Sequence, residues 1–217
     1  PLAFLFKYKN DIKKLNIFKY SLVILFGSAA MMFIVNIDVI LVKHFFPALE
    51  AGYYAAASML AKIPWFASGA LVAVMFPKIS DFHAKKKNSS SILKSTLFYT
   101  FLISFSVVAV YFVAPTFVTR MLYGNEYVGV NSLIGYFSLG LAFFALNNVL
   151  VMYNFAVHKT KFIYFVLLFL LAESFLIYFI HSTLLEVIKV VVVTNIALFF
   201  ALVLYTRKEF GVKNGIS

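Results

Sequence analysis

Six runs of apolar residues, each near the thickness of a bilayer, limit the folds open to this sequence. A hydrocarbon core about 30 Å thick needs about 20 apolar residues in a helix. None of the runs has the alternation of an outer-membrane barrel strand. We therefore predict an all-α polytopic membrane protein, with about six transmembrane helices forming one bundle over residues 17–205. The predicted helices cover residues 17–42, 52–76, 97–118, 133–155, 162–180 and 184–205.

The composition argues against a water-soluble domain. Of the 217 residues, 63% are hydrophobic and 12% are charged, whereas soluble domains are about half apolar and about a quarter charged. A soluble fold of this size could not cover so much apolar surface with polar groups. Lipid as the outer solvent removes this difficulty, so membrane lipids are the first expected partner. The sequence has no Cys, which excludes disulfides and thiolate metal sites.

The basic residues alternate between the two membrane faces that six helices would define. Fifteen of the 19 Lys and Arg lie before or within the first three residues of the first helix, after the second and fourth, and after the sixth. Only Lys43, Arg120 and Lys189 fall on the other side, and Lys62 lies inside the second helix. Because cytoplasmic loops carry an excess of Lys and Arg, we predict a cell-membrane protein with both termini in the cytoplasm. These loops account for the net charge of +11, so nucleic acid is not an expected partner.

The two ends of the chain lie outside the predicted bundle. We interpret residues 1–16 as a basic cytoplasmic connector and residues 206–217 as a cytoplasmic tail. An interfacial amphipathic helix is the alternative for the first segment. The sequence begins at Pro1, and residues 1–6 have the composition of the end of a helix. We therefore expect the chain to be part of a longer protein.

Charges inside the hydrocarbon cost free energy, so each is a candidate site. Asp38 lies about 6 Å below the end of the first helix, and Lys62 about 15 Å into the second, at about 1.5 Å per residue. A lysine stem can extend along the apolar layer towards the surface, so the two side chains are expected to meet. Two interpretations stay open: a structural ion pair, or polar groups of a transport cavity.

Pro64 interrupts the second predicted helix two residues after Lys62. Proline removes a helix hydrogen bond, and broken helices in membranes line cavities or act as hinges. Pro64 and Gly69 are therefore candidate hinge residues.

Glu173 lies in the fifth predicted helix, with no basic neighbour in sequence. It is either a neutral carboxyl that hydrogen-bonds between helices, with Asn195 as the expected partner, or a proton or coupling-ion site. The amides of Asn36, Asn147 and Asn148 are expected to hydrogen-bond between helices. Asn147 and Asn148 have a second interpretation, as residues lining a hydrated path.

The sequence contains no recognisable catalytic set. The four His residues lie in or beside loops, two on each predicted face, so they cannot form one site. There is no HExxH, GxSxG, P-loop or paired-carboxylate motif. We expect neither enzymatic activity nor a cofactor or metal site.

Four local patterns resemble a known family of membrane proteins. Asp38 lies near the end of one helix, the tract AGYYAAA at residues 51–57 opens the next, and FPKIS at residues 76–80 closes it. The loop YGNEY at residues 123–127 contains a Gly-x-x-Tyr pattern. Together they resemble the polysaccharide-export, or O-antigen flippase-like, family of the multidrug/oligosaccharidyl-lipid/polysaccharide exporter superfamily.

The resemblance implies the second half of a transporter of about twelve helices. Such a protein flips lipid-linked oligosaccharide across the cytoplasmic membrane by alternating access, and its other partner would be a missing N-terminal half or a second copy. A cavity for a lipid pyrophosphate needs cations, and Lys62 is the only deep one. The alternatives are a drug or cation exporter of the same superfamily, coupled through Asp38 or Glu173, and a membrane-embedded transferase acting on lipid-linked sugars.

Overall fold

The computed structural model describes residues 17–213, and within this range every regular element is a helix. Side chains are described except at residues 17–19, 125, 126, 128 and 208–213. The elements are α2 (Ile17–Ile34), α3 (Ile37–Phe45), α4 (Ala48–Ala61), α5 (Ile63–Ala84), α6 (Ser90–Val113), α7 (Pro115–Tyr123), the short 3-10 helix η1 (Asn125–Val130), α8 (Asn131–Ala156), α9 (Ile163–Phe179) and α10 (Leu184–Lys213).

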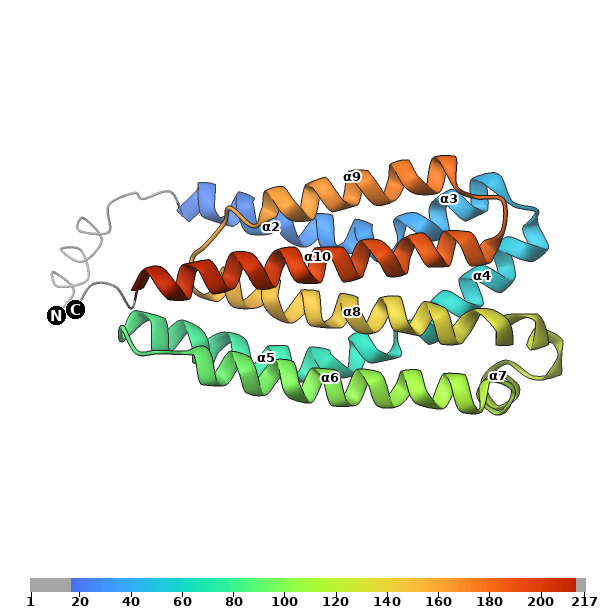
Figure 1. Ribbon diagram of the computed structural model, residues 1–217, viewed down its shortest axis with the longest axis horizontal. Helices are drawn as coiled ribbons and strands as arrows, with labels where there is room; N and C mark the ends of the chain where they lie inside the picture. Colours follow the sequence, from blue (N-terminus) through green and yellow to red (C-terminus); the bar gives the residue numbers. More distant parts are fainter. Residues whose placement is uncertain (1–16, 214–217) are drawn as a thin grey trace, which may run out of the picture.

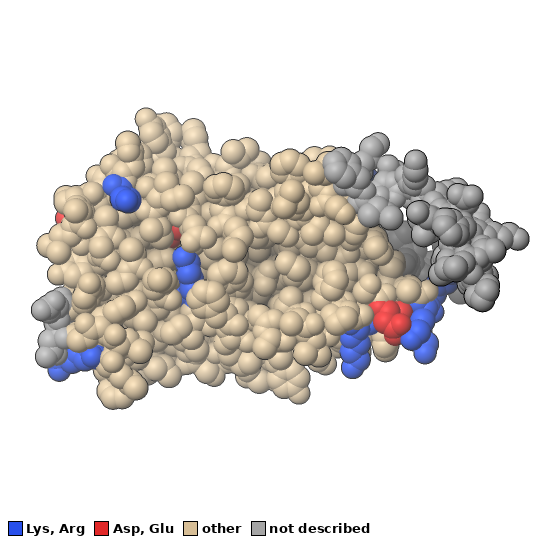
Figure 2. All heavy atoms as spheres, turned by 180° about the vertical axis from the view of Figure 1, so that it is seen from behind, with Lys and Arg blue, Asp and Glu red and all other residues tan. Residues whose placement is uncertain are grey.

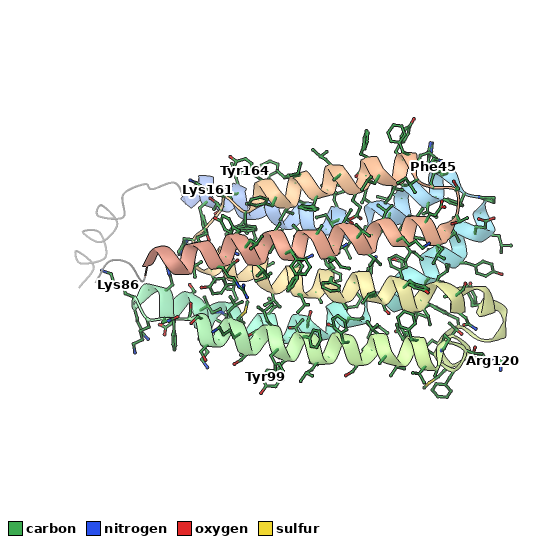
Figure 3. The ribbon with its side chains drawn as sticks, in the orientation of Figure 1. Phe45, Lys86, Tyr99, Arg120, Lys161 and Tyr164 are labelled. Carbon is green, nitrogen blue, oxygen red and sulfur yellow. The ribbon has the colours of Figure 1, made fainter. Side chains whose placement is uncertain are left out.

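The long helices lie side by side along one axis, and the described chain begins and ends at the same end of the bundle (Figure 1). Lys86 and Lys161 lie at this end and Arg120 at the opposite one (Figure 3). We call these the basic end and the Arg120 end. An even number of transmembrane helices, such as the predicted six, places both ends of the chain at the same end of the bundle.

The helices confirm an all-α polytopic protein. Among residues 17–213, four spans are long and apolar enough to cross a membrane: Ala48–Ala84, Ser90–Val113, Asn131–Ala156 and Leu184–Arg207. The pair α2 and α3, bent by 43°, makes a fifth if it counts as one span. The remaining predicted helix, α9, is apolar but has only 17 residues, which is near the lower limit of about 17 for a crossing helix. The sequence-based number of six thus corresponds to four or five spans by length, with α9 at the limit.

Several predicted boundaries were wrong. The second helix continues to Ala84 rather than residue 76, and the third begins at Ser90 rather than residue 97. The first helix is not continuous to residue 42 but breaks after Ile34 and resumes at Ile37. The third ends at Val113, and Pro115 begins the separate helix α7, since proline is well suited to a first helical turn. The last continues to Lys213, so part of the predicted tail is helical. The predicted connector, residues 1–16, lies outside the described residues.

Helix α8 forms the centre of the bundle and contacts α4, α5, α6 and α10. Most of its side chains are buried on all sides, as expected for a helix that is apolar all round. Gly140 permits the close approach of α10, because a Cβ there would lie 3.2 Å from Val192 Cγ2 and 3.4 Å from the Val192 backbone.

Gly140→Leu should therefore destabilise the bundle. Overpacking of a closely packed contact costs about 1–3 kcal/mol, so the thermal unfolding temperature in detergent should fall. Gly52→Leu is the matched control, since a Cβ at this helical position meets nothing within 4 Å. Equal unfolding temperatures for the two variants would contradict the close approach of α8 and α10.

Candidate functional site

Two broken helices meet at their breaks. The chain leaves helical geometry between α2 and α3 at Val35 and Asn36. Between α4 and α5 it keeps helical backbone angles at Lys62 (φ −77°, ψ −10°), so Ala48–Ala84 remains one span and the interruption there is one of hydrogen bonding. The Lys62 Nζ atom donates a hydrogen bond of 2.8 Å to Asn36 Oδ1. This bond joins the two interruptions, which lie 26 residues apart in sequence.

Asn36 satisfies the backbone at the first break. Its N–H bonds to the carbonyl of Phe33 instead of Met32, which leaves the Met32 carbonyl without its usual helical donor. The Asn36 Nδ2 atom donates to this carbonyl at 2.8 Å. One amide thus caps the end of α2 with its nitrogen and accepts from Lys62 with its oxygen.

The second break results from Pro64, as predicted. Proline has no N–H for the carbonyl four residues earlier, which here belongs to Leu60. The hydroxyl of Tyr111 in α6 donates to that carbonyl at 3.0 Å and is itself buried. Gly69 lies in the unbroken part of α5, so the interruption is confined to Lys62 and Pro64.

Asp38 follows the first break and is almost completely buried, with 2% of its surface exposed. Its Oδ2 atom accepts a 2.8 Å hydrogen bond from Tyr54 of α4. Its Oδ1 atom has no hydrogen-bond partner among the described residues. Asp38 and Lys62 are near enough to interact electrostatically. Lys62 nevertheless forms no ion pair with Asp38 within the described residues, where an ion pair joins Lys85 and Asp81 instead.

Glu173 of α9 is buried to the same degree, with 1% exposed. Thr194 of α10, rather than the expected Asn195, donates to its Oε2 atom at 2.8 Å. The Thr194 hydroxyl also lies 2.9 Å from the Val190 carbonyl. A hydroxyl has a single hydrogen, so both contacts are satisfied together when Glu173 carries the proton. The Oε1 atom has no hydrogen-bond partner within residues 17–213.

The two buried carboxyl groups lie at similar positions along the bundle axis. The Phe45 ring of α3 contacts the Tyr178 ring of α9 at 5.8 Å. Asp38 precedes Phe45 by about 10.5 Å along its helix, and Glu173 precedes Tyr178 by about 7.5 Å, at about 1.5 Å per residue. The carboxyls are close enough for their charges to interact. Two carboxyls that each leave one oxygen unsatisfied, in an apolar interior, form a place where a proton or a cation lowers the free energy.

The amides of α8 and α10 form a separate contact. Asn147 Nδ2 donates to the backbone carbonyl of Asn195 at 3.0 Å, and the Asn195 side chain bonds back to Val191. Both are buried, which agrees with the interhelical role predicted for Asn147. Asn148 is half-buried, and no hydrogen bond of its side chain occurs in the described part of the chain.

The two helix interruptions meet where Lys62 bonds Asn36, and we call this place the Lys62 junction. It faces the side of the bundle formed by α2–α5. Figure 2 views this side and shows charged side chains at both ends, with one basic side chain in the middle of a largely uncharged surface. Lys62, the basic residue that the sequence places in mid-helix, is 9% exposed. An apolar groove of about 380 Å³ lies nearer the basic end, between α2, α5 and α8. Its lining is Ile24, Val72, Ala73, Phe76, Pro77, Met152 and Phe155.

These features define a polytopic helical membrane protein with buried polar groups both at the interrupted helices α2–α5 and between α8, α9 and α10. Within the described residues, no group of three His, Cys, Asp or Glu is arranged to hold a metal ion.

A family model described as polysaccharide biosynthesis protein matches residues 6–132, more than half of the chain. The chain therefore belongs to the polysaccharide biosynthesis protein family, which confirms the resemblance noted from the sequence. The matched region contains both broken helix pairs. Comparison with curated proteins and comparison with solved structures each found no match.

Tyr111→Phe should destabilise the bundle, because the Leu60 carbonyl would lose its donor. Hydrogen bonds between membrane helices contribute about 0.6 to about 2 kcal/mol. The loss of unfolding free energy caused by Tyr111→Phe should be smaller in a Pro64→Ala background, where residue 64 regains its backbone N–H. A double-mutant cycle of unfolding free energies measures this coupling. Tyr136→Phe, at an exposed tyrosine, is the control, and an additive cycle would contradict the role given to Tyr111.

Proposed function

We propose that this chain forms half of a transporter that flips lipid-linked oligosaccharide, a polysaccharide precursor, across the cell membrane. Membership of a polysaccharide biosynthesis family and helices able to span a membrane support this proposal. The termini are cytoplasmic in the proposal, which follows from the basic end and the positive-inside rule. The other half, or a second copy, would cover the α2–α5 side.

The observation that carries the proposal is the position of Lys62. It is a buried cation at a junction of two broken helices, and Asn36 rather than a carboxylate accepts its hydrogen bond. Its charge is therefore available to a phosphate that reaches the junction. Transporters bind substrate at discontinuous helices near the middle of the bilayer. The apolar groove nearer the basic end suits the hydrocarbon part of such a substrate.

Lys62→Ala should reduce transport while abundance in the membrane stays unchanged. A charge-assisted hydrogen bond contributes about 1.5–3 kcal/mol, so we expect at least about a tenfold loss. The measurement is clearance of lipid-linked sugar from the cytoplasmic leaflet in a strain lacking the gene, complemented with each variant.

Lys62→Arg should retain part of the activity, and Lys43→Ala, at the Arg120 end, should retain all of it. A collapse in abundance of Lys62→Ala would make Lys62 a structural residue. Normal export of the polysaccharide in the deletion strain would contradict the flippase proposal itself.

The pair Asp38 and Glu173 supports coupling of transport to a proton or cation. Each carboxyl is buried and keeps one oxygen without a hydrogen-bond partner inside the described chain. Intramembrane carboxyls of this kind belong to ion and proton pathways. The same observation favours the second candidate function, a drug or cation exporter. Sensitivity of the deletion strain to cationic compounds, without a defect in polysaccharide, would favour that alternative.

Glu173→Gln should leave abundance unchanged and remove the dependence of transport on the pH gradient. Glutamine retains the size of the side chain and a partner for Thr194, but it cannot exchange a proton. The readout is transport as a function of external pH, compared with Glu50→Gln, an exposed carboxyl in α4. A variant whose pH profile matches the wild type would assign Glu173 a structural role only.

A further inference from the structure

Helix α7 lies across the bundle instead of along it. In Figure 1 it is seen end-on, while the long helices run along the view. It begins at Pro115, and only Ala114 separates it from the last residue of α6, Val113. Arg120 of α7 lies at the end of the bundle (Figure 3). The chain therefore turns sideways directly where the long helix α6 ends.

The side of α7 that faces the bundle is held by polar groups. Asn131, the first residue of α8, donates from Nδ2 to Thr116 Oγ1 at 3.0 Å, and its Oδ1 atom accepts from the Thr119 hydroxyl. Thr119 is completely buried. The Tyr123 hydroxyl donates to the Ala56 carbonyl of α4 at 3.4 Å. These contacts fix the rotation of α7 about its own axis, so one side of the helix always faces outwards.

This outward side of α7 is apolar. Phe117, Met121 and Leu122 are 66%, 73% and 53% exposed. Phe117 and Met121 are four residues apart, so they lie next to each other on the helix surface. A surface helix of a water-soluble protein has the reverse arrangement, with its apolar side inwards and its polar side outwards. The inverted arrangement of α7 indicates that its outward side lies against an apolar medium.

The position of α7 along the bundle matches the edge of a hydrocarbon layer. Lys94 near the beginning of α6 is exposed, and the sequence has no charged residue between it and Arg120. From Lys94 to Val113 the helix rises about 28.5 Å, at about 1.5 Å per residue. This rise is close to the thickness of the hydrocarbon core, which is about 30 Å. Because a charge in hydrocarbon is costly, α7 begins where α6 leaves the apolar layer.

Arg120 lies at one edge of the apolar side, three residues after Phe117, and is exposed. An arginine in this place extends its charged group towards water while its stem covers apolar surface. Helices with one apolar side and a basic residue beside it lie in the plane of the membrane surface. The crosswise direction of α7, its apolar outward side and its place at the end of α6 all agree with this arrangement.

We propose that α7 is an interfacial helix, which lies in the membrane surface at the Arg120 end and inserts Phe117, Met121 and Leu122 among lipid acyl chains. Its partner is the lipid of that leaflet, contacted through the hydrocarbon. Since Asn131 joins α7 to α8, the insertion also fixes the level of the central helix in the membrane. The proposal requires a membrane around the bundle, and it is independent of what the protein transports.

The test uses the full chain in vesicles of dioleoyl phosphatidylcholine. The chain has no Cys, so a spin label on one introduced Cys reports a single position. Collision of the label with oxygen, which concentrates in hydrocarbon, is compared with collision with a water-soluble nickel complex. Phe117→Cys and Met121→Cys should show a higher oxygen-to-nickel ratio than Arg120→Cys. Lys85→Cys supplies the reference for water, and Leu102→Cys, at an exposed position in the middle of α6, the reference for hydrocarbon.

The ratios at residues 117 and 121 should fall between the two references, as expected for side chains just below the membrane surface. Ratios equal to the water reference would overturn the proposal, because this side of α7 would then lie outside the membrane. Loss of collision with both reagents would also overturn it, since protein, such as the other half or a second copy, would then cover the helix. Equal ratios at residues 117 and 120 would contradict the proposed orientation.

Discussion

The α2–α5 side is built around two helix interruptions, which the hydrogen bond between Lys62 and Asn36 joins. A backbone polar group left without a partner in hydrocarbon costs several kcal/mol, and two broken helices produce such groups twice. Asn36 satisfies the first break and Tyr111 the second. The bond from Lys62 then joins the two breaks. The same contact holds the one deep cation in position, so structural and functional requirements coincide at a single pair of side chains.

The spans were largely predictable because hydrophobic length is a local property. Residues 133–155 and 162–180 were expected as helices, and α8 and α9 end within two residues of these limits. The break at Asn36 was not predictable, since no proline or glycine occurs between Ile34 and Ile37. It is stabilised by a lysine 26 residues away. The break at Pro64 was predictable because its cause lies in the covalent structure of proline.

The site residues were identified individually, but their partners were not. The position of a residue along its helix can be counted from the sequence, and this count correctly predicted that Glu173 meets α10 near residues 194 and 195. Adjacent residues of a helix point about 100° apart, so depth alone could not choose between Thr194 and Asn195. The same uncertainty affected Asp38, which pairs with Tyr54 instead of Lys62. Tyr54 and Tyr111 escaped notice because a tyrosine in an apolar run resembles any other aromatic residue until its hydroxyl has a partner.

The two breaks also suit the proposed alternating access. A conformational change is least costly where few residues must alter their backbone angles, and both interruptions are limited to one or two residues. Both parts of each interrupted helix pack against the same partner: α2 and α3 contact α9, and α4 and α5 contact α8. Towards the basic end, α2 and α5 also border an apolar groove. A motion of α2 and α5 about the Lys62–Asn36 junction would therefore move them along α9 and α8 and change access to this groove. The charge that a phosphate would bind lies at the pivot, where it moves least.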